Sequence, residues 1–103
     1  MHVYAHCLRG RPGGVALLAI NTDHTAARAL TVPTAGERYT LSSSAAGSLQ
    51  EKRVHLNGVE LVLSANDDLP ALRGEPIGAG TIVLSPATVT FLTFEAAANS
   101  ACR

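Results

Sequence analysis

The sequence predicts an all-β fold, a two-sheet antiparallel β-sandwich of about eight strands in one domain over residues 1–103. Three observations support this. Turn-forming residues divide the chain into short segments at regular intervals. Most segments are rich in apolar and β-branched residues, which favour strands. The one stretch with helical character, residues 25–30, is too short to be stable as a helix on its own.

The expected strands follow one another along the chain and are separated by loops. The glycine- and proline-rich residues 9–14, for example, can form neither a helix nor a strand. The second strand is apolar on both faces, as expected for a central strand covered on both sides. Small residues over 42–48 predict a flexible loop, and the proline- and glycine-broken segment 66–80 predicts an extended crossing between sheets. Outside one hairpin, the expected strands cover residues 3–8, 15–20, 28–32, 38–42, 81–84 and 88–94.

The hairpin is predicted by Asn57-Gly58, because both residues tolerate the positive φ of a type I′ turn. A two-residue turn pairs Leu56 with Val59 and His55 with Glu60. One face of the hairpin is then apolar throughout, so the turn and the hydrophobic pattern agree on the register. This face carries Val54, Leu56, Val59, Leu61 and Leu63.

Length and charge exclude several functions. With 103 residues, the chain has no room for a catalytic (β/α)₈ barrel of roughly 250 residues. Eight basic residues balance eight acidic ones, so nothing in the overall charge favours nucleic acid or an anionic membrane. No run of about 18 apolar residues is present to form a membrane span.

The residues also predict no catalytic, cofactor or metal site. His2, His6 and Cys7 are close in sequence, but on a strand the histidines lie roughly 13 Å apart and Cys7 points to the opposite face. No nucleophile elbow is present. Asp67 and Asp68 are expected to bond to local backbone in a turn.

Three groups of residues leave alternatives open. Phe91 and Phe94 are expected in the core, while Tyr4 and Tyr39 could be either structural or exposed. A glycan- or protein-binding module would need exposed aromatics or a basic cleft. The residues available for such a cleft are Arg9, Arg11, Lys52 and Arg53. Spacing alone does not decide whether Cys7 and Cys102 are bridged or free.

Several motifs stand in a specific order and spacing along the chain: Val3-Tyr4-Ala5-His6-Cys7, Leu18-Ala19-Ile20-Asn21, Val54-His55-Leu56-Asn57-Gly58 with Leu61, Asp67-Asp68-Leu69-Pro70-Ala71-Leu72, Glu75-Pro76 and Ala101-Cys102. Together they resemble the C-terminal β-sandwich domain of the heparanases and related enzymes of glycoside hydrolase family 79. The match covers nearly the whole chain. A shorter loop over 9–14 and the Ala- and Ser-rich segment 42–48 differ from the animal enzymes and suggest a bacterial relative.

The resemblance implies a disulfide between Cys7 and Cys102, and hence a secreted or periplasmic protein. It also implies a parent enzyme, a retaining endo- or exo-β-glucuronidase acting on glucuronides such as heparan sulfate. The family's two catalytic glutamates lie on its barrel and match no position here. The chain would then be a non-catalytic accessory domain that packs on the barrel and takes in a strand from upstream. Alone, it would have an open sheet edge through which copies could associate.

Overall fold

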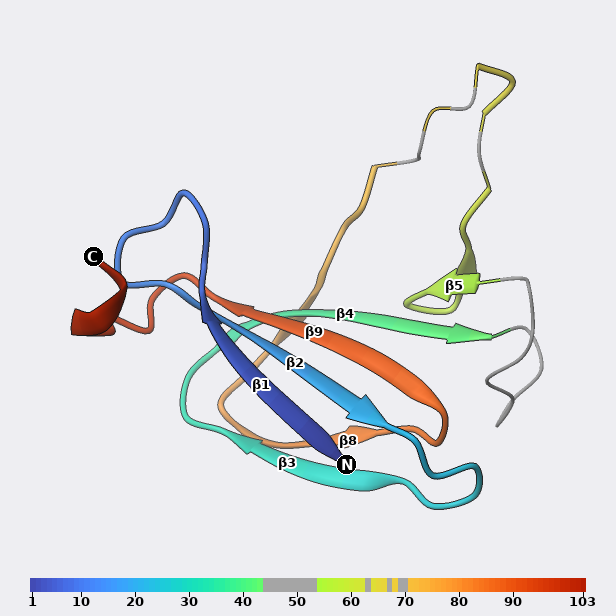
Figure 1. Cartoon of the computed structure of the whole chain (residues 1–103), viewed down its shortest axis with the longest axis horizontal. Coiled ribbons are helices and arrows are strands. Elements are labelled where there is room, and N and C mark those ends of the chain that lie inside the picture. Colours follow the sequence, from blue (N-terminus) through green and yellow to red (C-terminus); the bar gives the residue numbers. More distant parts are fainter. Residues whose placement is uncertain (44–53, 63, 67, 69–70) are drawn as a thin grey trace.

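The structure is a computed structural model that describes residues 1–43, 54–62, 64–66, 68 and 71–103 (Figure 1). Nine strands and one short 3₁₀ helix, η1 (Ser100–Cys102), form in this part of the chain. No helix there is long and apolar enough to cross a membrane. The strands are β1 (His2–Cys7), β2 (Val15–Asn21), β3 (Arg28–Val32), β4 (Gly36–Ser43), β5 (Val54–Leu56), β6 (Val59–Glu60), β7 (Glu75–Ile77), β8 (Gly80–Leu84) and β9 (Thr88–Phe94).

The strands form two antiparallel sheets, which confirms the predicted fold class. The large sheet has the order β1-β2-β9-β4-β5-β6, and β7 pairs with the opposite end of β4. The small sheet consists of β3 and β8 alone. Figure 1 shows the small sheet lying across one side of the large sheet, with β5 beside the end of β4.

The hairpin at Asn57-Gly58 forms as predicted. Both residues have positive φ, 51° and 85°, as a type I′ turn requires. His55 lies opposite Glu60 and Leu56 opposite Val59. Beyond β6, the Leu61 amide donates to the Val54 carbonyl at 2.8 Å, so the register continues for one more pair. Leu63 lies outside the described residues.

One strand was not predicted. Within the segment expected to be an irregular crossing, β7 pairs with β4, placing Pro76 opposite Glu37. Proline cannot donate a ladder hydrogen bond, so its presence counted against a strand. Among the described strands β7 pairs with β4 alone. It is therefore an edge strand, where proline is tolerated.

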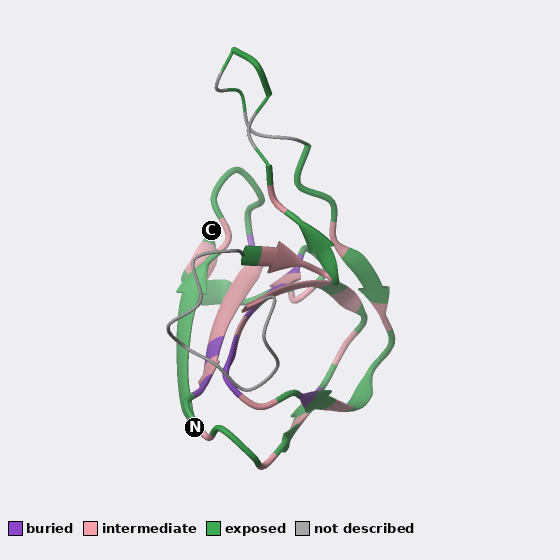
Figure 2. Ribbon diagram, turned by 90° about the vertical axis from the view of Figure 1, so that its right-hand side faces the viewer, coloured by how far each residue is buried: buried purple, intermediate pink, exposed green. Residues whose placement is uncertain are grey.

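The core lies between the two sheets, on the side of β9 that carries Leu92 and Phe94. These side chains are 0% and 3% exposed, and they form a buried cluster with Val32 of β3. Half-buried residues from both sheets and from the segment after β9 pack around this cluster, namely Leu17, Leu30, Ile77, Ile82 and Ala97. Figure 2 shows this burial along the ribbon, with the exposed segments in green.

The prediction that Phe91 belongs to the core was wrong, whereas Phe94 is in the core as predicted. Neighbouring side chains on a strand point to opposite faces. Phe91 therefore points away from β3 and β8, and it is 41% exposed. For the same reason Leu18 and Ile20 of β2, expected to be covered, are only half-buried.

Candidate functional site

The candidate site is the outer face of the large sheet, the side that points away from β3 and β8. Strand register places Tyr4, Leu18, Phe91 and Tyr39 in one row across β1, β2, β9 and β4. Directly paired residues of antiparallel strands project to the same side. Three of the four aromatic side chains of the protein thus share this row. Tyr4 is 55% exposed, the most open of the three.

A second row extends the outer face to the hairpin. The register aligns Ile20 with Val89, Val89 with Leu41, and Leu41 with Leu56 and then Val59. The apolar face of the hairpin is therefore continuous with the outer face. Val59 is 70% exposed at its end. A soluble monomer rarely exposes so extended an apolar surface unless the surface serves an interaction.

One corner of the outer face is hollowed. An open depression of about 320 Å³ lies over β1, β2 and β9, and Tyr4, Leu18 and Phe91 are among its lining residues. Leu8 and Arg9, from the loop after β1, also line it. The depression combines aromatic walls with one guanidinium, so an apolar group with an adjacent anionic group would fit it best.

The border of the outer face near the start of β4 is polar. The Tyr39 hydroxyl donates to Glu37 Oε2 at 2.9 Å. This hydrogen bond, together with partial burial, raises the pKa of Tyr39, because deprotonation would place two negative charges side by side. Arg11 Nε lies 3.5 Å from Glu95 Oε1, and both side chains are largely exposed. Such a pair contributes little to stability.

The candidate basic cleft is only partly described. Arg9 lines the depression, and Arg11 pairs with Glu95. Lys52 and Arg53 lie outside the described residues. The grouping of these four cations therefore stays a prediction.

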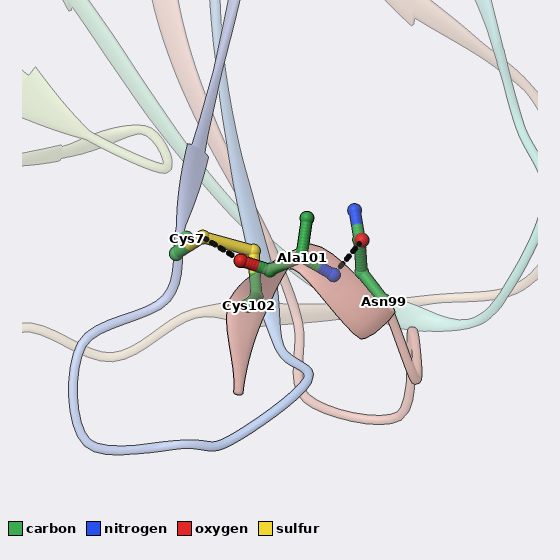
Figure 3. The surroundings of a disulfide bond; sticks show 4 residues. All are labelled: Cys7, Asn99, Ala101 and Cys102. Atoms are coloured by element: carbon green, nitrogen blue, oxygen red, sulfur yellow. Dashed lines mark hydrogen bonds between the residues drawn. A yellow bond between two sulfur atoms is a disulfide. The ribbon is translucent and has the colours of Figure 1, made fainter.

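The predicted disulfide is present. Cys7, at the end of β1, is bonded to Cys102 in η1, with a Cα–Cα distance of 5.2 Å (Figure 3). The C-terminal turn is also held by backbone hydrogen bonds. Gly13 N donates to the Cys102 carbonyl at 2.6 Å, and Asn99 N donates to the Gly13 carbonyl at 2.9 Å. The disulfide thus joins the outermost strand of the large sheet to the chain end.

Among the described residues, no group of three His, Cys, Asp or Glu side chains is placed to hold a metal ion. His2 and His6 lie on the same side of β1 as Tyr4, at either end of the strand. Asp68 lies in a local turn, where its amide donates to Ser64 Oγ at 3.1 Å. Asp67 lies outside the described residues.

A polar corner after β2 was not predicted from the sequence, and its role is structural. The buried Asn21 side chain donates to the Ala26, Leu84 and Ser85 carbonyls at 3.1–3.2 Å, linking β2 to the end of β8. Nearby, Asp23 accepts hydrogen bonds from the Thr25 and Ala26 amides, which lower its pKa to about 2. The turn residues were visible in the sequence, but their long-range partners were not.

Comparison with known proteins finds two similar relatives. The chain is 29% identical over 113 aligned residues to the human and mouse proteins named inactive heparanase-2. The alignment includes the whole chain but only 19% of each relative, so the chain spans about a fifth of their length. No protein-family model matches the chain.

Proposed function

We propose that the chain is the non-catalytic C-terminal β-sandwich domain of a larger heparanase-like polypeptide, and that it packs on the catalytic barrel through its outer face. The observation that carries this proposal is the apolar outer face itself. The row through Phe91 and the row through Val89 each cross at least four strands, and neither row contains an Asp, Glu, Lys or Arg side chain. The likeness to about a fifth of two heparanase-2 proteins supports the same assignment.

The sequence of β2 supports docking on this side. Its continuous apolar run is typical of a strand covered on both faces. Yet Ala19 is buried, at 1% exposed, toward the small sheet, and Leu18 on the other side is only half-buried. A partner surface over Leu18, Tyr4 and Phe91 would complete that cover. Aromatic side chains in such a position commonly contribute a large share of binding energy.

The two sheets differ in size, which favours a further strand supplied by the same larger polypeptide. The second layer has only β3 and β8 among the described strands. On the inner side of β1, Val3 is 42% exposed, and every residue of β1 is exposed. A strand from upstream, as the resemblance implies, would cover this region. Without it, the free edge of β1 offers a place where copies of the chain could pair.

The disulfide favours a compartment outside the reducing cytoplasm. We propose a secreted or periplasmic protein, with a bacterial source as the finer expectation. Glucuronides or heparan sulfate chains would be bound by the barrel of the parent. The relatives are named inactive, and an accessory role for this chain does not depend on whether the parent is catalytically active.

A second candidate function is glycan or protein binding by the chain on its own. The depression beside Tyr4, Phe91 and Arg9 favours it, because sugar rings stack on aromatic faces and a guanidinium pairs with a uronate. Calorimetry with heparan sulfate oligosaccharides and simple glucuronides separates the two candidates. Saturable heat that Arg9→Ala abolishes would favour glycan binding. No heat would favour docking.

The docking proposal predicts that the chain stays bound to the remainder of the polypeptide after the connection is cut. A protease site engineered immediately before β1 allows cleavage after folding, and gel filtration then shows whether the two parts elute together. We expect co-elution for the unchanged protein. Phe91→Asp should weaken binding by about a hundredfold or more, because an unpaired carboxylate would be buried.

Val83→Asp is the matched control for this experiment. Val83 is an exposed apolar residue, 57% accessible, on a strand of the small sheet. Its replacement should leave co-elution unchanged. Complete separation of the unchanged parts would contradict the docking proposal. Release by Val83→Asp but not by Phe91→Asp would show that the chain docks through the side of the small sheet and would contradict docking through the outer face.

A further inference from the structure

The Asn57 side chain fills a gap along one edge of β4. On this edge, β5 pairs with residues 41–43 and β7 with residues 36–38, leaving the stretch between them without a strand. There the Thr40 amide donates to Asn57 Oδ1 at 2.8 Å, and the Asn57 amide donates to the Thr40 carbonyl at 2.8 Å. One residue of the turn thus replaces a piece of the missing strand.

The side-chain nitrogen of Asn57, Nδ2, makes two further hydrogen bonds. Asn57 Nδ2 donates to the Arg38 carbonyl at 3.1 Å and to the Arg73 carbonyl at 3.2 Å. The first bond holds β4, and the second holds the segment that leads into β7. Both acceptors require a donor at this position. A single side-chain amide therefore connects the hairpin to β4 and to residues 71–74, the crossing segment that leads into β7.

The same residue belongs to the one Asn-Gly pair in the sequence. With no side chain on Gly58, its backbone nitrogen can reach the Asn57 side-chain carbonyl carbon with little hindrance. Attack forms a bond from Gly58 N to Asn57 Cγ and breaks the Cγ–Nδ2 bond. The amide nitrogen leaves as ammonia and carries away the proton from Gly58 N. Water then opens the cyclic imide to aspartate or isoaspartate, so no oxidant or reductant is needed.

We infer that Asn57 is a deamidation site whose amide the fold protects, and that its conversion releases the hairpin and the crossing segment from β4. Protection follows because the hydrogen bonds at Oδ1 and Nδ2 hold the amide in place. Release follows because a carboxylate has no donor for the Arg38 and Arg73 carbonyls and would place a negative charge against them. Isoaspartate would also add a backbone carbon to a two-residue turn.

Peptide mapping by mass spectrometry tests the protection. The whole chain, with its disulfide intact, is incubated in mildly alkaline buffer with and without a denaturing concentration of urea. We expect deamidation at Asn57 to be at least about tenfold slower in the folded protein, because its side-chain hydrogen bonds must open first. Equal rates in the two conditions would overturn the inference.

Asn57→Asp tests the release, with Asn66→Asp as the matched control. Asn66 is exposed, and the same substitution there changes charge equally. We expect Asn57→Asp to unfold at a lower urea concentration than Asn66→Asp, and to expose the amides of β7, which pair with β4, to hydrogen exchange. Failure of Asn57→Asp alone to fold would also support the inference. Identical unfolding midpoints and exchange for the two variants would contradict it.

Discussion

Replacing Phe94 with Ala should lower the free energy of unfolding by about 3–5 kcal/mol. The ring is 3% exposed and belongs to the buried cluster with Val32 and Leu92, so its removal leaves a cavity between the two sheets. Urea unfolding followed by circular dichroism measures the change. The expected loss is a large part of the stability of a domain of this size.

Phe91→Ala is the matched control, since it removes the same ring from the same strand on the opposite face. Because Phe91 is 41% exposed, we expect a loss of only about 1 kcal/mol in the isolated chain. In the larger polypeptide the same substitution should weaken docking. If Phe91→Ala and Phe94→Ala destabilised the isolated chain equally, both faces of β9 would be part of the core, and the outer face would not be available.

The second large effect concerns the disulfide. Replacing both Cys7 and Cys102 with Ser should lower the free energy of unfolding by about 2–5 kcal/mol. The bond joins residues 95 apart in sequence, and cross-links that close long loops restrict the unfolded chain most. Urea unfolding with and without a reductant measures the loss.

The double variant provides its own control. Since the chain has two cysteines and both are in the disulfide, a reductant should destabilise the unchanged protein and leave the variant unaffected. The reduced protein and the variant should then unfold at similar urea concentrations. A variant as stable as the oxidised protein would show that the C-terminal turn is held by its backbone hydrogen bonds alone.

The strands could be predicted because their signals are local. Asn57-Gly58 fixes a turn, the turn fixes a register, and the alternation of apolar residues agrees with it. β7 was missed because a proline counts against a strand until its place at a sheet edge is known. The disulfide could not be decided from spacing, and it was expected only from the family resemblance.

The site was harder to predict than the fold. Alternation along β9 separates Phe91 from Phe94, but it does not say which face is covered. Here the buried positions of β9 include Thr88 and Thr90, so the more polar alternate residues point inward with Leu92. The row from Tyr4 to Tyr39 depends on the strand order β1-β2-β9-β4, which joins residues from both ends of the chain. No local signal specifies that order.

The most direct test of the outer face as a docking surface is hydroxyl-radical footprinting of the chain alone and within the larger polypeptide. Tyr4 and Phe91 are reactive side chains, 55% and 41% exposed in the isolated chain. Docking predicts that labelling of both falls at least severalfold in the larger polypeptide, while labelling of Val83 does not change. Equal labelling of Tyr4 and Phe91 in the two forms would show that the outer face stays open to solvent and would contradict the proposal.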